Sequence, residues 1–266
     1  MGDMILSRII DSTKERVAQC KKQLPLHALR EQAEALHKAK PHTRSFENAL
    51  RTKGLSAICE IKKASPSKGI INASFPYLDI ARAYERAGAN AISCLTEPHY
   101  FLGSDEIFTQ VREICPLPML RKDFTIDPYM IYQAKIMGAD AVLLIVSALD
   151  LPQLRDFYAL AESLGLCVLV ETHTEQEIEQ ALELDARIIG VNNRDLHTFS
   201  VSLQTSLDLR PLVPESKVFV SESGIGSVSD LRKLLESKVD AVLIGEWFMK
   251  EGASALTELM TRELQD

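Results

Sequence analysis

The stretch GADAVLLIV, residues 138–146, shows the pattern that decides the fold: a glycine, small and polar residues, and then a short apolar run. The stretch GANAISCL, residues 88–95, resembles it closely, and both follow segments with helical spacing. A glycine in the left-handed conformation can end a helix directly before a strand. The two stretches therefore look like copies of one unit of strand and helix.

Eight apolar runs of this kind occur between residues 56 and 245, and segments with helical spacing separate them. The runs are SAICEI (56–61), NAISCL (90–95), LPMLR (117–121), DAVLLIV (140–146), LCVLV (166–170), RIIGV (187–191), KVFVS (217–221) and DAVLIG (240–245). This alternation predicts a parallel sheet with helical crossovers. Eight units fit a closed (β/α)8 TIM barrel, which typically has about 250 residues. An open doubly wound sheet is the alternative, although no GxGxxG follows the first strand, as its dinucleotide-binding form requires.

The first fifty residues have a different pattern, with apolar residues at helical steps and charges between them. Pro25 separates ILSRIIDSTKERVAQCKKQL from LHALREQAEALHKA, and a proline interrupts a helix. We expect residues 1–50 to be a helical N-terminal extension of one domain that spans residues 1–266. No linker or low-complexity segment divides the chain.

Composition narrows the function classes. The 266 residues carry 37 acidic and 30 basic side chains, a net charge of −7 that argues against a nucleic-acid partner. The five cysteines form no CxxC pair and the six histidines no ligand pair, which favours reduced thiols and disfavours a metal site. No signal peptide begins the sequence, and the apolar run 141–146 is too short to span a membrane. We therefore expect a cytoplasmic monomer without metal or membrane contact.

Polar side chains end several of the predicted strands. Side chains alternate along a strand, so Glu60 and Lys62 share a face and point into the barrel mouth if Ile58 points inward. Taken singly, each such residue could be a solvated loop residue or part of a salt bridge. Taken together they form one rim at the C-terminal ends of the strands, where barrel enzymes carry their chemistry. Such a cluster can supply general acids and bases and suits an anionic substrate. Its members are Glu60, Lys62, Lys122, Glu171, Asn192 and Glu222.

Two glycine-containing segments and one long connection also stand out. Ser223-Gly224-Ile225-Gly226 follows the seventh run and Gly245-Glu246 the eighth, where barrels often bind phosphate with backbone N–H groups. The alternative is ordinary turn glycines. The connection from Lys63 to about Tyr77 is long enough for a lid over the site, with a tolerated surface insertion as the alternative.

The stretch EIKKASPSKG, residues 60–69, resembles the signature of the indole-3-glycerol-phosphate synthase family. Further matching stretches cover nearly the whole chain: HYF (99–101), LRKDF (120–124), VE (170–171), GVNNRDL (190–196) and SESGI (221–225). The resemblance implies a (β/α)8 barrel with N-terminal helices, no cofactor and a phosphorylated small-molecule substrate. It implies the conversion of 1-(2-carboxyphenylamino)-1-deoxyribulose 5-phosphate to indole-3-glycerol phosphate, carbon dioxide and water in tryptophan biosynthesis.

The resemblance also implies roles for individual residues. Lys122 matches the general acid of ring closure, and Glu60, Lys62 and Glu171 match the other acid–base and orienting groups. The matching substrate-binding residues are Asn192, Arg194, Phe124 and Glu222. The matching phosphate-binding residues are Ser65, Ser223, Gly224, Gly245 and Glu246. The chemistry agrees, because ring closure develops negative charge on a ketone oxygen and an ammonium group lowers that barrier.

Two stretches depart from the family pattern, and other functions stay open. Residues 70–74 read IINAS where the family more often has charged residues, and Trp247-Phe248 replaces small residues, which we expect to pack under the last helix. Phosphoribosylanthranilate isomerase is an alternative, since phosphate loops are shared, but Lys62, Lys122 and Glu171 favour the synthase. A non-catalytic sensing or scaffold barrel and a partner in a multienzyme complex are further alternatives.

Overall fold

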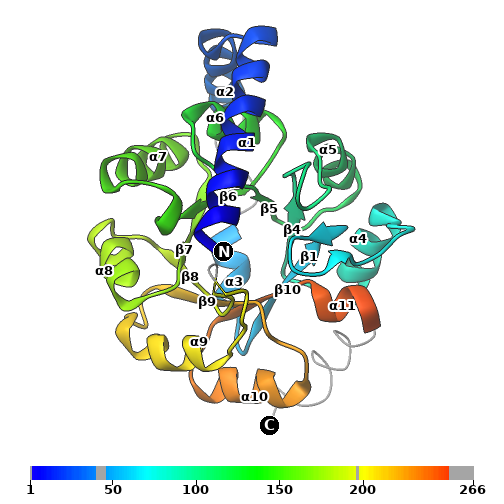
Figure 1. Cartoon of the computed structure of the whole chain (residues 1–266), viewed down its shortest axis with the longest axis vertical. Coiled ribbons are helices and arrows are strands. Elements are labelled where there is room, and N and C mark those ends of the chain that lie inside the picture. Colours follow the sequence, from blue (N-terminus) through cyan, green and yellow to red (C-terminus); the bar gives the residue numbers. More distant parts are fainter. Residues whose placement is uncertain (1, 40–45, 196–197, 252–266) are drawn as a thin grey trace.

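Eight parallel strands form a closed barrel in the computed structural model, which describes residues 2–39, 46–195 and 198–251 (Figure 1). The strands are β1 (Ser56–Ile61), β4 (Ala91–Leu95), β5 (Met119–Lys122), β6 (Ala141–Ile145), β7 (Cys167–Thr172), β8 (Ile188–Asn192), β9 (Val218–Glu222) and β10 (Ala241–Ile244). Each overlaps one of the eight predicted runs. The predicted TIM barrel is therefore confirmed, and the open sheet is wrong because β1 pairs with both β4 and β10.

Helices surround the barrel. They are α4 (Tyr77–Arg86), α5 (Asp105–Ile114), α6 (Pro128–Ile136), α7 (Leu151–Ser163), α8 (Glu175–Glu183), α9 (Gln204–Leu209), α10 (Val228–Glu236) and α11 (Glu246–Glu251), with 3-10 turns at Val146–Ala148 and Arg210–Leu212. Several begin at a residue whose side chain accepts a first-turn backbone N–H, as Ser104, Asp127 and Thr174 do. Gly138 and Gly165 have φ values of 80° and 71° at the ends of α6 and α7, as expected for left-handed helix ends. None of the described helices combines the length and apolar character needed to cross a bilayer.

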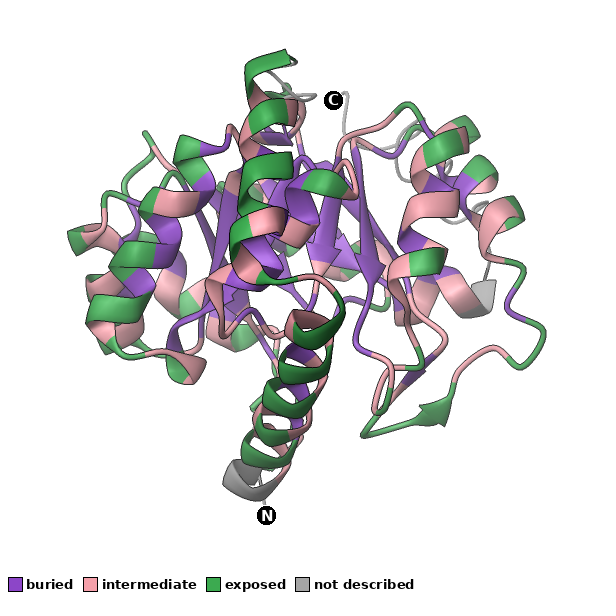
Figure 2. Cartoon of the chain, turned by 90° about the horizontal axis from the view of Figure 1, so that it is seen from above, coloured by how far each residue is buried: buried purple, intermediate pink, exposed green. Residues whose placement is uncertain are grey.

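Alternation along the strands divides the core into two parts. Ile58, Leu120 and Leu169 belong to a buried cluster inside the barrel, which Phe46 and Leu50 of α3 (Phe46–Leu50) join. The intervening strand residues pack outward against the helices, so the strands are buried on both faces (Figure 2). Continuing the inward alternation beyond these apolar residues brings the polar strand ends to the mouth of the barrel.

The N-terminal extension forms helices, as predicted. α1 (Gly2–Gln23) ends before Pro25, and α2 (Leu26–Ala39) packs along α6, while residues 40–45 of the predicted extension lie outside the described residues. α1 runs across the barrel mouth toward its N-terminus (Figure 1). Arg16 binds Asp123 through two hydrogen bonds of 2.9 and 2.7 Å, and Lys21 binds Asp127 at 2.6 Å. These contacts fix α1 over the C-terminal ends of the strands.

The long first connection contains a small hairpin that the sequence analysis did not predict. β2 (Ala64–Ser65) pairs antiparallel with β3 (Gly69–Ile70), and Gly69 has a φ of 65° at the turn. The following segment is shaped by Asn72, whose Oδ1 accepts hydrogen bonds from Ser74 Oγ and from the backbone N–H of Phe75. The hairpin lies beside the barrel mouth.

Candidate active site

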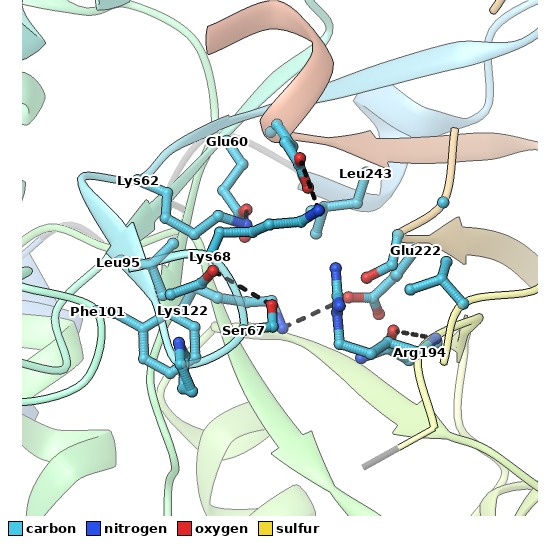
Figure 3. A pocket seen from close by; sticks show the side chains of 18 of the residues that line it. Glu60, Lys62, Ser67, Lys68, Leu95, Phe101, Lys122, Arg194, Glu222 and Leu243 are labelled. Carbon is cyan, nitrogen blue, oxygen red and sulfur yellow. Dashed lines mark hydrogen bonds and ion pairs between the residues drawn. The ribbon is translucent and has the colours of Figure 1, made fainter. Parts of the chain in front are cut away.

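A cavity of about 750 Å³ opens at the C-terminal end of the barrel (Figure 3). Every site residue predicted from the sequence lines it: Glu60, Lys62, Ser65, Lys122, Phe124, Glu171, Asn192, Arg194, Glu222, Ser223, Gly224, Gly245 and Glu246. Figure 3 shows Glu60 and Lys62 across the cavity from Glu222 and Arg194. Residues far apart in the sequence therefore meet in one space.

Lys122 lies among the carboxylates of this rim. Its Nζ donates a hydrogen bond of 2.9 Å to Glu171 Oε2 and lies 3.4 Å from Glu222 Oε2. Burial by itself lowers the pKa of Lys122, but the carboxylates of Glu171 and Glu222 outweigh burial and raise the pKa above its usual value. The side chain is therefore an ammonium group at neutral pH.

The two carboxylates beside Lys122 have opposite electrostatic environments. Burial by itself raises the pKa of Glu171, but Lys122 and His173 outweigh burial and lower the pKa to about 2. Burial raises the pKa of Glu222 to about 8, and Glu171 adds to this shift while Lys122 opposes it. The pKa of one carboxylate is thus lowered and that of the other raised, with both carboxylates within reach of one ammonium group, as in acid–base pairs.

Two glycines leave room for the carboxylates of the rim. A Cβ atom on Gly190 would overlap Glu222 Oε1, and a Cβ on Gly245 would overlap Glu60 Oε2. Glu222 Oε1 is buried and makes no hydrogen bond within the described part of the chain. On the other side of the cavity, Lys62 Nζ forms an ion pair with Glu60 Oε2. Gly190 and Gly245 are therefore needed because a side chain at either position would overlap a candidate catalytic carboxylate. This requirement is separate from any role of these glycines in a turn.

The predicted phosphate-binding residues gather at one end of the cavity. Ser223 and Gly224 have φ values of 67° and 76°, a conformation that turns the backbone after β9, and Asn193 Nδ2 holds it by donating to Ser223 O at 3.0 Å. Lys68 of the hairpin reaches across to Glu246, with Nζ 3.7 Å from Oε1 (Figure 3). The β2–β3 hairpin and the start of α11 thereby approach each other over this end.

The opposite wall is apolar and includes residues that the sequence analysis missed. The rings of Phe101 and Phe124 lie 6.0 Å apart, centroid to centroid. Ile5, Leu6 and Ile9 of α1 complete this wall. Periodicity shows that α1 has an apolar face, but nothing in the pattern indicates that this face covers the barrel mouth.

Trp247 contacts both an aromatic neighbour and the cavity. Its ring stacks on Phe248 with centroids 5.4 Å apart, and Phe248 packs against Tyr84. Trp247 also lines the cavity. Trp247 is partly buried against the hydrophobic core and also forms part of the cavity edge, while its expected packing under the last helix stays a prediction, because residues 252–266 lie outside the described part of the chain.

His173 is a second group that the sequence analysis missed. It follows β7, two residues after Glu171, and its Nε2 lies 3.5 Å from Glu171 Oε1. Its Nδ1 lies 3.2 Å from Glu177 Oε2. The signal was available, because residues 169, 171 and 173 share one side of an extended chain.

Asn192, the last residue of β8, and Arg194 just after it continue the rim. Asn192 Nδ2 donates to Glu171 Oε1 at 3.1 Å, and Asn192 Oδ1 accepts the backbone N–H of Arg194 at 3.0 Å. Asn192 thereby orients Glu171 and places Arg194 at the cavity edge. The arrangement combines two ammonium groups, a guanidinium group, two carboxylates whose pKa values are shifted in opposite directions, and an apolar wall.

Comparisons with known proteins agree in sequence and fold. Residues 6–259 match the family model described as indole-3-glycerol phosphate synthase. The protein of that name from Ruminiclostridium cellulolyticum is 50% identical over 249 residues, covering 94% of this chain and 95% of its own. The one from Endomicrobium trichonymphae is 49% identical over 258 residues, covering 96% and 99%. Among solved structures, thiamine phosphate pyrophosphorylase from Pyrococcus furiosus is similar in fold, with a TM-score of 0.61 at 17% identity, covering 82% of this chain and 100% of its own.

Proposed function

The chain belongs to the indole-3-glycerol phosphate synthase family, and from that premise we propose which of its residues carry the reaction. The enzyme is a carboxy-lyase of tryptophan biosynthesis. It closes the indole ring of 1-(2-carboxyphenylamino)-1-deoxyribulose 5-phosphate with loss of carbon dioxide and water. The family match decides against the isomerase and the non-catalytic barrel.

The first step needs an acid at the ketone oxygen. The ring carbon that bears the carboxylate attacks the ketone, and negative charge develops on its oxygen. We assign the proton donor to Lys122, because its ammonium group is held at the cavity floor by Glu171 and Glu222. An ammonium group in a water-poor site stabilises such an oxyanion strongly. This position of Lys122 is the observation that carries the proposal.

The later steps need a base and a second acid. Loss of carbon dioxide restores the aromatic ring, and loss of water then needs a proton on the departing hydroxyl and removal of a proton from the neighbouring carbon. We assign the base to Glu171, whose pKa is lowered chiefly by Lys122 against the effect of burial. Glu222 is the acid candidate, because burial raises its pKa to about 8. Lys62, paired with Glu60, supplies a second ammonium group toward the anionic substrate.

The remaining cavity residues are assigned to substrate binding. Phe124 and the α1 residues face the aromatic ring, and Asn192 and Arg194 hold the polar chain. The phosphate is assigned to Ser65, Ser223, Gly224, Gly245 and Glu246, with Glu246 contributing its backbone N–H. The Lys68 ammonium neutralises the Glu246 side chain at 3.7 Å, which keeps this end of the cavity suitable for an anion.

The test is product formation by the purified protein. Indole-3-glycerol phosphate, followed by its fluorescence, is expected from the synthetic substrate. The dephosphorylated substrate should bind much more weakly, and inorganic phosphate should compete with the phosphorylated one. Equal affinity for the two substrates contradicts the phosphate assignment while leaving the ring-closing residues open to their own test.

The enzyme is proposed to act as a single-domain monomer in the cytoplasm. No disulfide joins any of the five cysteines, all of which lie within the described residues, and this fits a reducing compartment. Light scattering should give a mass near 29.6 kDa. A mass of twice that value contradicts the monomer. Elution of the activity from cell extract at a larger size would indicate a multienzyme complex.

A further inference from the structure

His173 lies between two carboxylates, one inside the cavity and one outside it. Its backbone N–H donates to Glu177 Oε2 at 2.6 Å, and its Nδ1 lies 3.2 Å from the same oxygen. Its Nε2 is buried, forms no hydrogen bond within the described chain, and lies 3.5 Å from Glu171 Oε1. Glu222 of β9 also acts on the ring electrostatically.

This geometry determines where the imidazole carries its hydrogen atoms. Glu177 can only accept when ionised, so Nδ1 carries a hydrogen in both charge states of the ring. In the neutral ring, Nε2 has a lone pair that faces the Glu171 carboxylate. In the imidazolium ring, Nε2 carries a hydrogen that the carboxylate attracts. Burial by itself lowers the pKa of His173, but Glu177 and Glu171 outweigh it and raise the pKa above its usual value. The imidazolium form is favoured.

The reaction consumes one proton in each turnover. The substrate carboxylate leaves as neutral carbon dioxide, the ketone oxygen is protonated twice, first to a hydroxyl and then as it departs as water, and only one proton is recovered from carbon. Under the roles proposed above, Lys122 recovers its proton through Glu171, and Glu222 is left one proton short. A covered cavity needs a local source for that proton.

We propose that His173 is a positioning residue that stores one proton beside Glu171 and supplies the proton lost by Glu222. The proton moves along contacts already described: Nε2 to Glu171 at 3.5 Å, Glu171 to Lys122 at 2.9 Å, and Lys122 to Glu222 at 3.4 Å. The bond from Nε2 to hydrogen breaks and a carboxyl O–H forms on Glu171. Glu171 then gives a proton to Lys122 as Lys122 gives one to Glu222. His173 ends neutral with its hydrogen on Nδ1, and it regains a proton from water after product leaves.

The inference rests on the proposed roles of Glu171 and Glu222, and two variants separate it from them. His173→Gln keeps an N–H donor near Glu171 but removes the titrating group. Glu177→Gln keeps the hydrogen-bond acceptor for Nδ1 but removes its charge, which lowers the pKa of His173 without touching Glu222. Product formation by the unmodified enzyme tests the proposed function, whereas the differences among the three proteins test the proton store.

The first measurement is the NMR titration of nitrogen-15-labelled histidine, with His173→Gln identifying the resonances. We expect both ring nitrogens of His173 to stay protonated above pH 6.5, and the transition to move to lower pH in Glu177→Gln. A neutral ring at pH 6.5 overturns the proposal. This measurement needs no activity and remains decisive through Glu177→Gln if His173→Gln fails to fold.

The second measurement is the pH dependence of kcat. We expect a fall with rising pH as His173 loses its proton, a shift of this fall to lower pH in Glu177→Gln, and its absence in His173→Gln. At neutral pH, kcat of His173→Gln should drop by less than about a hundredfold, the lower end for loss of an acid that contacts substrate, with KM nearly unchanged. Identical pH profiles in the three proteins overturn the proposal, since any titration of Glu222 would stay in place in all of them.

Discussion

Three consecutive charged residues, Arg121, Lys122 and Asp123, belong to two different buried clusters. Arg121 and Asp123 form one cluster with their ion-pair partners, and Lys122 belongs to the other. Arg121 does not line the cavity, whereas Asp123 lines it but has both carboxylate oxygens engaged by Arg16 and Thr96. Arg121 donates to the backbone oxygen of Met130 at 2.9 Å and to Asp105 at 2.8 Å, and Asp123 accepts two hydrogen bonds from Arg16. All four of these charged side chains are hydrogen-bonded to a partner of opposite charge, Arg121 to Asp105 and Arg16 to Asp123. Lys122 instead faces the cavity together with Glu171 and Glu222.

The difference lies in what each cluster leaves unpaired. Asp123 also accepts from Thr96 Oγ1 at 2.6 Å, and although burial by itself raises its pKa, Arg16 and Arg121 lower it below the ordinary range. In the Lys122 cluster, Glu222 Oε1 and His173 Nε2 are buried without a hydrogen bond among the described residues. A saturated cluster holds α1 onto the barrel, whereas an unsaturated one retains donors and acceptors for a substrate.

Lys122→Met is the strongest test of this difference. It keeps most of the apolar stem and removes the proton donor, so kcat should fall by about a hundred- to ten-thousandfold with near-native circular dichroism and measurable binding of a substrate analogue. Lys68→Met is the control. Lys68 is a half-exposed hairpin lysine that pairs with Glu246, and its loss should change kcat by less than about fivefold, with any effect of the missing ammonium group seen in KM. Near-normal turnover of Lys122→Met would move the acid to Lys62 or Glu171.

Asp123→Ala should lower the free energy of unfolding, whereas Lys122→Met should lower kcat. Removing one partner of a buried ion pair typically costs about 3–5 kcal/mol, because the other charge stays buried. The urea midpoint should therefore fall sharply. Lys14→Ala breaks an exposed pair with Asp11, in which both side chains are about two-thirds exposed, and should change the free energy of unfolding by less than about 1 kcal/mol. Equal midpoints for the two variants would contradict a structural role for the Asp123 cluster.

Acid unfolding should show how much the ionised Glu171 carboxylate contributes to stability. Burial by itself raises the pKa of Glu171, but Lys122 outweighs it and lowers the pKa to about 2 in the folded protein, below its ordinary value of 4.5. The ionised carboxylate therefore stabilises the fold above pH 4.5, and this contribution is lost as the pH falls toward 2. The loss should reach about 3 kcal/mol at most. Urea unfolding at several pH values should show a shallower acid dependence in Glu171→Gln, whereas Glu183→Gln, in an exposed pair with Arg155, should follow the unmodified protein.

Gly245→Ala should have the smallest effect of the four. The new Cβ would overlap Glu60 Oε2, so Glu60 and its partner Lys62 must shift. We expect kcat to fall about tenfold, less than the roughly hundredfold cost of a 1 Å misplacement. In a Glu60→Ala background the same glycine change should cost less, because the overlap with Oε2 is removed and only the tight 3.1 Å contact with the Cβ of residue 60 remains. An additive double variant would show that Gly245 acts elsewhere, through the phosphate end.

Much of this comparison can be predicted from the sequence. The alternation in Leu120-Arg121-Lys122 places Lys122 inside and Arg121 outside once Leu120 is assigned to the barrel interior. Eight apolar runs separated by helical segments predict the barrel, and polar residues that end those runs predict the rim.

Other parts depend on three-dimensional packing that a local pattern does not encode. The apolar face of α1 predicts burial of Ile5 and Leu6, but the direction in which a helix docks depends on contacts such as Arg16 with Asp123 over a long sequence separation. The role of Gly245 depends on Glu60, at the far end of the barrel sequence. The β2–β3 hairpin has only two residues in each strand, too few for a periodic signal.

The pairing of β1 with β10 has a consequence for how the enzyme is made. Ser56 pairs with Ala241 and Cys59 with Ile244. β1, the first barrel strand to be synthesised, therefore lacks this partner until β10 has been synthesised. At about 5–20 residues per second, this interval lasts on the order of ten seconds or more. During this time one edge of β1 is exposed, and Glu60 lacks the wall that Gly245 later provides. A chain that terminates before β10 carries Lys122 and Glu171 but cannot close the barrel. Catalytic competence is therefore acquired only after β10 has been translated.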